Sequence, residues 1–202
     1  MKQLVLLSLL TAFLFVSCDN SQVLVPKPRM FPKVNYPVKS YTSFDINTCP
    51  FEMDIPKYFQ YIKDTTVIDY PTNKNVDVSC WFDLYSKDLN AYMHISYFDI
   101  QKSIGFDKLV GDAFEMADKH NVKANYRDEI KINDPSRSLH GIIFEIDGPV
   151  ATPLQFFVTD STEHFLRGSL YFKSKVNRDS IAPVYNFLKE DITRLLESFK
   201  WN

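Results

Sequence analysis

The sequence predicts an α+β domain in which an antiparallel sheet is packed by two main helices. Several short stretches alternate between apolar and polar residues, which is typical of half-buried strands. Two longer stretches repeat their apolar residues at helical spacing, and they lie far apart in the chain. Antiparallel runs of strands combined with two separated amphipathic helices favour an α+β sandwich.

The first residues resemble the signal peptide of a bacterial lipoprotein. Met1 and Lys2 give a positive start, and residues 4–16 form an uncharged apolar run. This run is shorter than the roughly 20 residues that cross a bilayer as a helix, but it suits a secretory signal. Cleavage after Ser17 would leave Cys18 at the new N-terminus. We expect lipid on Cys18, since two or three acyl chains make release negligible; an ordinary cleaved signal is the alternative.

The segment after Cys18 predicts an extended tether. It is rich in proline, and such segments form semi-rigid spacers. We therefore expect a signal peptide over residues 1–17, a lipidated tether over 18–44 and a single globular domain over 45–202. The protein would be anchored in the cell envelope, to the inner or the outer membrane, and would face the periplasm.

The first half of the domain should consist of strands followed by a helix. Residues 63–79 are polar and contain a proline, which predicts a loop, and residues 87–90 predict a hairpin turn. Helical spacing of apolar residues begins after Ser103, a candidate N-cap, and continues to His120. The expected strands are residues 49–56, 58–62, 80–86 and 91–98.

The second half should contain three strands and a closing helix. Residues 121–140 are mostly polar and predict a loop. Asp179 is placed as the N-cap of the last helix, and Pro183 should fall in its first turn, where a missing N–H costs little. The apolar stripe of this helix ends at Phe199. The expected strands are residues 141–147, 153–159 and 164–172.

Composition and motifs exclude several classes of function. The apolar fraction is 45%, which is enough for a core, and the net charge is −2. No basic tract interleaves with aromatic residues, so nucleic-acid binding has no support. The sequence has no HExxH, GxSxG, Walker or GxGxxG motif, and its histidines lie far apart. We therefore expect a protein that is not an enzyme, with no cofactor and no metal.

Cys49 and Cys80 remain when Cys18 is set aside. An even pair in an oxidising compartment favours a disulfide. Closing a loop of this length would stabilise the domain by roughly 3.5–4 kcal/mol in the chain-entropy model. The alternative is two separately buried thiols, because cysteine is among the most buried residue types.

A polar cluster at residues 159–168 is the strongest candidate site. Its acid, hydroxyl, imidazole and guanidinium groups suggest chemistry, but residues 160–163 also make a good hairpin turn, because Asp and Ser cap their own backbone. Arg167 should lie beside aromatic rings and stack on them. We interpret Arg167, His164 and Phe165 as possible partner contacts, with an internal ion pair as the alternative for Arg167.

Two features of the predicted strands and helices complete the pattern. Gly168 lies inside a strand, where glycine weakens packing unless a bulge or a close backbone approach requires it. The pairs Glu145/Asp147 and Glu190/Asp191 lie opposite apolar residues of their elements. Both pairs are therefore expected on solvated faces.

Five stretches of the sequence carry a family resemblance: PKPR (26–29), CPFEMDIPKY (49–58), CWFDLY (80–85), PLQFFVTDSTEHFLRGSLYF (153–172) and NRDSIAPVYNFLKEDITRLLESFKW (177–201). Together they resemble one family, the gliding motility lipoprotein GldD of the Bacteroidota. The resemblance implies a lipid-anchored accessory of the gliding machinery, linked to type IX protein secretion, with no catalytic residues. Its partners would be the membrane, through the N-terminal lipid, and other gliding or secretion proteins. The alternative is a lipid-anchored envelope enzyme or small-ligand binder. The pattern is also similar to the PsbP type of α/β/α sandwich.

Overall fold

The computed structural model describes residues 33–46, 48–63, 77–173 and 178–202. The predictions for the signal peptide, for Cys18 and for most of the tether lie outside these residues. No described helix is long and apolar enough to cross a membrane.

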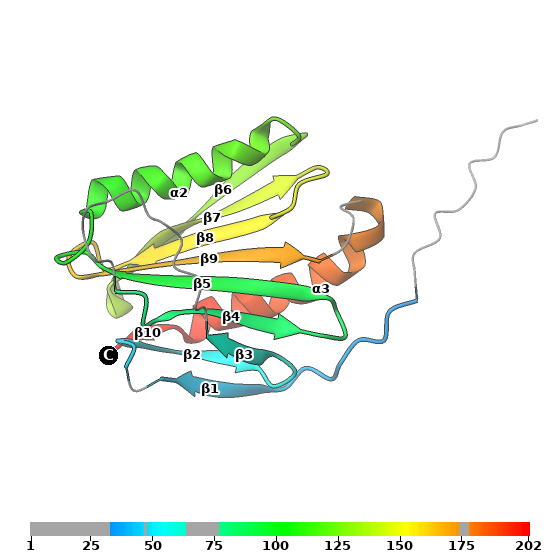
Figure 1. Ribbon diagram of the computed structural model, residues 1–202, viewed down its shortest axis with the longest axis horizontal. Helices are drawn as coiled ribbons and strands as arrows, with labels where there is room; N and C mark the ends of the chain where they lie inside the picture. Colours follow the sequence, from blue (N-terminus) through cyan, green and yellow to red (C-terminus); the bar gives the residue numbers. More distant parts are fainter. Residues whose placement is uncertain (1–32, 47, 64–76, 174–177) are drawn as a thin grey trace, which may run out of the picture. The chain divides into compact units, whose positions relative to one another are not determined.

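A seven-stranded sheet forms the centre of the fold, and every neighbouring pair in it is antiparallel. Strands β5 and β9 lie in its middle, and β3 and β6 form its two edges (Figure 1). In spatial order the strands are β3 (Gln60–Lys63), β4 (Trp81–Ser86), β5 (Ala91–Asp99), β9 (His164–Phe172), β8 (Leu154–Thr159), β7 (Leu139–Asp147) and β6 (Tyr126–Asp134).

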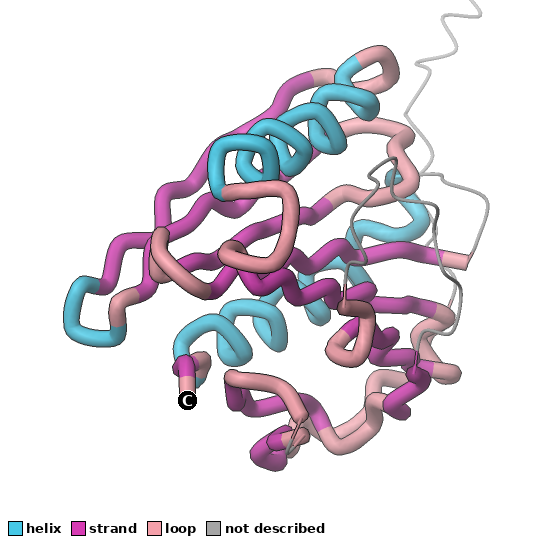
Figure 2. The backbone as a smooth tube through the Cα atoms, turned by 60° about the vertical axis from the view of Figure 1, so that its left-hand side comes forward, coloured by secondary structure: helices cyan, strands magenta, loops and turns pink. Residues whose placement is uncertain are grey.

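Two helices cover opposite faces of this sheet (Figures 1 and 2). Helix α2 (Phe106–Asn121) packs on what we call the α2 face, and helix α3 (Arg178–Ser198) on the α3 face. A second sheet joins α3 on its side; it consists of β1 (Tyr41–Asp45), β2 (Phe51–Pro56) and β10 (Lys200–Trp201). The short 3₁₀ helix η2 (Pro135–Arg137) links β6 to β7. The predicted fold class, an antiparallel sheet packed by two main helices, is confirmed.

Each face of the sheet has its own apolar core, because strand side chains alternate between faces. On the α3 face, Phe51 of the small sheet, Leu84 of the large sheet and Leu195 of α3 are almost fully buried together. On the α2 face, Leu109 of α2 packs with Phe165 of β9 in a second cluster. Both faces of the central strands are therefore covered, which explains the nearly continuous burial of β8 and β9.

A disulfide joins Cys49, in the turn before β2, to Cys80, just before β4, with their Cα atoms 5.6 Å apart. The bond links the small sheet to the large one.

Gly168 allows a side chain of the neighbouring strand to approach the backbone of β9 closely. The ring of Phe156, its partner across β8 and β9, lies over it so closely that a Cβ on Gly168 would be 2.3 Å from the ring. Glycine in this strand therefore makes room for an aromatic ring.

The structure differs from the predicted elements at several points. Strand β6 lies in the segment expected to be a loop, residues 121–140, because pairing along β7 compensates for its polar sequence. Strand β1 begins inside the segment assigned to the tether. Helix α2 has Gly105, not Ser103, as its N-cap, with a positive φ of 92° that glycine tolerates. Helix α3 starts at Arg178, which places Pro183 beyond its first turn.

Candidate functional site

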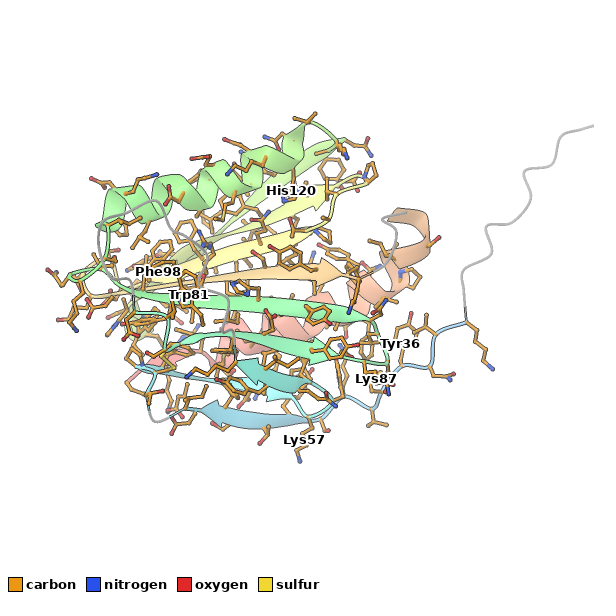
Figure 3. All side chains as sticks on the ribbon, in the orientation of Figure 1. Tyr36, Lys57, Trp81, Lys87, Phe98 and His120 are labelled. Carbon is orange, nitrogen blue, oxygen red and sulfur yellow. A yellow bond between two sulfur atoms is a disulfide. The ribbon has the colours of Figure 1, made fainter. Side chains whose placement is uncertain are left out.

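A row of three tyrosines crosses the α2 face of the large sheet. Tyr85 of β4, Tyr92 of β5 and Tyr171 of β9 are direct cross-strand neighbours, and we call them the tyrosine row. The rings of Tyr85 and Tyr92 stack with centroids 4.3 Å apart, and Tyr171 is 41% exposed. Lys173 Nζ lies 5.7 Å from the centre of the Tyr92 ring. The row lies next to the β4–β5 turn, where Figure 3 labels Lys87.

A band of polar side chains lies next to the tyrosine row, towards the interior. His94 Nδ1 is 2.8 Å from Asp83 Oδ1, and Gln155 Nε2 donates to Thr152 Oγ1 over 3.0 Å. The same hydroxyl contacts the ring of His120 at the end of α2. Burial lowers the pKa of His120, because the charged imidazolium would lose hydration. This band ties α2 to the sheet.

Arg167 lies on the same face of the sheet, beyond the polar band as seen from the tyrosine row. It is almost completely buried, with an exposed fraction of 8%. Its guanidinium is 5.6 Å from the centre of the Phe98 ring. Among the described residues, nothing accepts a hydrogen bond from its Nη1, and the hydroxyl of its cross-strand neighbour Ser96 is also buried without a partner. A buried charge without a counter-ion is costly. Phe98 packs edge-on against Trp81, and both are labelled in Figure 3.

The structure separates the three side chains that the sequence analysis grouped as partner contacts. Phe165 is fully buried beneath α2, so it has no surface to offer a partner. Arg167 shares that face but is buried as well, and no described carboxylate pairs with it. His164 belongs to the α3 face; its Nδ1 is 2.8 Å from the hydroxyl of Tyr97, and its ring stacks on Trp201 with centroids 5.1 Å apart. Alternation along β9 causes this division.

The hairpin turn before His164 is held by one carboxylate. Asp160 Oδ1 accepts hydrogen bonds from the backbone N–H groups of Thr162, Glu163 and His164 over 2.8–3.0 Å. Burial acts to raise the pKa of Asp160, but these backbone donors outweigh it and lower the pKa. The acid of the predicted cluster therefore organises a turn.

His164 also lines a cavity of about 580 Å³ between the two sheets. Acidic side chains dominate its charged lining: Asp45, Asp77 and Asp99 face it, and Lys102 binds Asp99 over 2.7 Å. The hydrogen bond from Lys102 lowers the pKa of Asp99. Within the described residues no group of His, Cys, Asp and Glu side chains could hold a metal ion.

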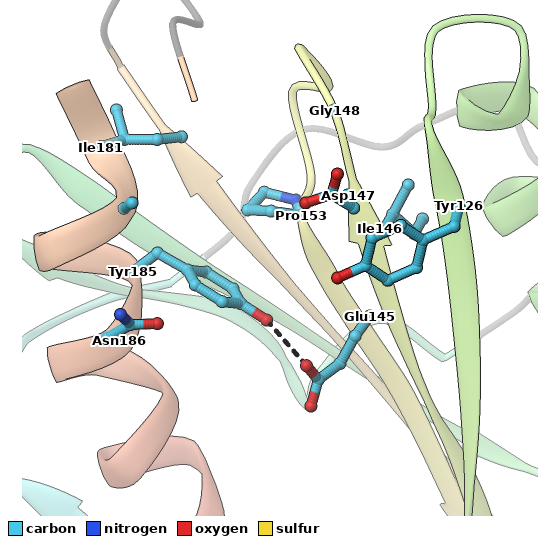
Figure 4. Close-up of a pocket in the computed structure, with 10 residues that line it drawn as sticks. Tyr126, Glu145, Ile146, Asp147, Gly148, Pro153, Ile181, Tyr185 and Asn186 are labelled. Carbon is cyan, nitrogen blue, oxygen red and sulfur yellow. Dashed lines mark hydrogen bonds between the residues drawn. The ribbon is translucent and has the colours of Figure 1, made fainter. Parts of the chain in front are cut away.

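A smaller cavity of about 150 Å³ lies between α3 and strands β6 and β7 (Figure 4). The hydroxyl of Tyr185 points across it to Glu145 Oε2, 3.4 Å away, and Lys189 binds the other oxygen of Glu145 over 2.6 Å. Asp147, which was expected on a solvated face, is 7% exposed and accepts a hydrogen bond from Asn125 over 3.0 Å. That expectation was wrong for Asp147, because β6 and α3 enclose it.

The sequence analysis missed the tyrosine row. Each tyrosine occupies an outward position of an expected strand, so the alternation of Tyr85, Tyr92 and Tyr171 was visible. The missing information was the pairing of β5 with β9, which are more than 60 residues apart. Aromatic residues on the polar side of several strands are the signal that could have indicated such a surface.

Comparisons with known proteins found similar solved structures and a matching family model. The structure is similar to the solution structure of cyanobacterial PsbP (CyanoP) from Synechocystis sp. PCC 6803. The identity is 11%, the similarity covers 85% of this chain and 98% of that one, and the TM-score is 0.48. No curated protein matches the chain.

The family model described as gliding motility lipoprotein GldD matches residues 21–201. This range contains both sheets, both helices and every sequence block that carries the resemblance. The chain therefore belongs to the GldD family of gliding motility lipoproteins.

Proposed function

We propose that the chain is a non-enzymatic, lipid-anchored accessory protein of the gliding machinery that binds another protein through the tyrosine row. The observation that carries this proposal is the row itself. Two tyrosines of the β4–β5 hairpin and one from the distant strand β9 form one surface strip on the sheet. Tyrosine is enriched at protein interfaces and in their binding hot spots.

The anchor and the location form the second part of the proposal. The lipid would be attached to Cys18, and the domain would face the periplasm of a member of the Bacteroidota. The partner would be a component of the gliding machinery or of type IX secretion. A disulfide between Cys49 and Cys80 suits this compartment, since disulfides persist where the surroundings are oxidising.

A second candidate function is the binding of a small anion, and the environment of Arg167 favours it. Arg167 Nη1 and the Ser96 hydroxyl are adjacent buried groups without partners among the described residues. Against it, ligand sites are usually clefts of roughly 300–1,000 Å³ with mostly apolar walls. The cavity beside Glu145 is smaller than this, and the larger one has acidic walls and does not include Arg167.

The test is crosslinking in gliding cells that express the full chain with Tyr92→Ala or Tyr171→Ala. Loss of one interface tyrosine should reduce the crosslinked partner about tenfold or more, because hot-spot side chains each contribute strongly to binding. Tyr36→Ala is the matched control, since Tyr36 is 42% exposed and belongs to the segment before β1. The crosslinked partner is identified by mass spectrometry.

Three outcomes decide between the candidates. Loss of a gliding or secretion component with both tyrosine variants, but not with Tyr36→Ala, supports the protein-contact function. Equal recovery from all variants removes the tyrosine row from the proposal. Equal recovery combined with loss of motility in Arg167→Met favours the anion-binding candidate.

The lipid anchor is tested separately. Cys18→Ala should move the protein out of the membrane fraction, and retention of the variant in that fraction would contradict lipidation.

A further inference from the structure

Strand β6 forms a long exposed edge of the large sheet (Figure 1). It pairs with β7 through nine consecutive residues without a bulge, and no strand among the described residues pairs with its outer side. Tyr126 and Ile130 on this strand are 54% and 45% exposed. An edge of this kind presents a row of unpaired N–H and C=O groups and is a template for another strand.

We propose that β6 pairs antiparallel with β6 of a second copy of this chain, about a twofold axis at Ile130. Two seven-stranded sheets would then continue into each other. A symmetric dimer requires a surface that is complementary to itself. The sequence of β6, YRDEIKIND, meets this requirement at one register.

The charges around Ile130 match in this arrangement. Glu129 of one copy faces Lys131 of the other, and the twofold axis repeats the pair. Side chains directly opposite each other on antiparallel strands lie on the same face, with Cβ atoms about 4.5–5.5 Å apart, and opposite charges there are stabilising. Both side chains are exposed. Glu129 also accepts a hydrogen bond from Arg127 over 2.7 Å, but a carboxylate can accept from several donors.

Neighbouring registers are unfavourable for the same reason. An axis at Asp128, Glu129 or Lys131 would place that charged residue opposite its own copy, and like charges in this position are destabilising. An axis at Ile130 instead brings two exposed isoleucines together on the α3 face. The register is therefore selected by the charges, and contact between the isoleucines adds apolar burial.

The test uses the full chain with Ile130→Cys, produced in cells and analysed by non-reducing electrophoresis after mild oxidation. At the axis, the two new thiols would have Cα atoms about 4.5–5.5 Å apart, which lies within the range for a disulfide. The expected result is a covalent dimer. Cys49 and Cys80 are joined to each other in the described structure and should not contribute.

Asp128→Cys is the matched control, because it lies on the same strand and face and is exposed. At the proposed register it faces residue 132 of the second copy, so its own two copies would be about 14 Å apart, four residues along the strand. It should give no dimer. In the Ile130→Cys background, Glu129→Lys or Lys131→Glu alone should reduce the dimer about tenfold, and the two together should restore it.

These outcomes test the proposed dimer and not the proposed function of the tyrosine row, since β6 and the tyrosine row share no residue. A dimer with Ile130→Cys, none with Asp128→Cys, and rescue by the double charge reversal support the proposal. No dimer with Ile130→Cys, equal dimer with both cysteines, or no response to the charge reversals would each overturn it.

Discussion

Two buried charges lie on opposite faces of the same sheet, and their surroundings are opposite as well. Asp191 of α3 is 1% exposed and has three partners: the hydroxyls of Tyr41 and Tyr58, and Lys39 Nζ at 3.3 Å. Arg167, on the α2 face, is 8% exposed; its guanidinium lies over the Phe98 ring, and no described carboxylate forms an ion pair with it. Among the described residues, Asp191 therefore has partners on both sides, whereas Arg167 has no counter-ion.

The difference separates a structural site from a candidate binding region. Asp191 connects α3 to β1 and to the segment before it, since Lys39 also donates to the Phe187 carbonyl over 2.9 Å. Burial and the hydrogen bond to Asp191 raise the pKa values of Tyr41 and Tyr58, which keeps both hydroxyls as donors. A paired buried charge holds elements together, whereas an unpaired one costs stability.

The largest effect is expected at Asp191. Asp191→Asn should lower the free energy of unfolding by about 3 kcal/mol, because it removes the charge that pairs with Lys39 and weakens two buried hydrogen bonds. Urea denaturation followed by tryptophan fluorescence measures it. Glu190→Gln is the control: Glu190 binds the same lysine but its side chain is 73% exposed, so its loss should cost less than about 1 kcal/mol. Equal losses of unfolding free energy in the two variants would mean that the burial of Asp191 does not make its ion pair more important than that of Glu190.

An opposite sign is expected at Arg167. Arg167→Met replaces a buried charge that has no counter-ion in the described part of the chain by an apolar side chain of similar size, so the free energy of unfolding should rise by about 1 kcal/mol. Arg127→Met is the matched control. Arg127 lies on the same face, 5.7 Å from the Phe144 ring, but it pairs with Asp118 and Glu129; its loss should lower stability by about 1 kcal/mol. A large loss with Arg167→Met would show that its charge is paired in solution.

The smallest effect concerns the pH dependence of the α2 face. Burial holds the pKa of His120 below the ordinary value of 6.5 for a histidine. As the pH falls, the His120 side chain therefore takes up a proton in the unfolded chain before it does so in the folded one. The stability that the neutral His120 contributes is fully present above the pKa of the unfolded chain. It is lost as the pH falls from that pKa to the lower pKa of the folded protein. His120→Gln should flatten the change in stability between pH 7.5 and 5.5, measured by urea denaturation at each pH. An unchanged slope would contradict a buried neutral imidazole.

Local patterns predicted most of the fold. The expected strands correspond to β2, β3, β4, β5, β7, β8 and β9, and helical spacing located both main helices. The strands that were missed, β1, β6 and β10, are short or mostly polar. Strand β6 has a polar sequence and exists because β7 supplies its hydrogen bonds along nine residues. Asp191 shows the same limit for a single residue: it was expected in solvent opposite the apolar stripe of α3, and the small sheet buries it.

The fold class, the two helices, the family resemblance and the expected lipid at Cys18 can all be read from the sequence, since each rests on residues close together in the chain. The pairing of the buried charges, the neighbouring positions of Tyr92 and Tyr171 and the place of β6 at the edge of the sheet become visible only in the folded protein. These properties depend on contacts between distant segments. A residue's own neighbours in the sequence specify its secondary structure, but its hydration and its counter-ions depend on what the rest of the chain places against it.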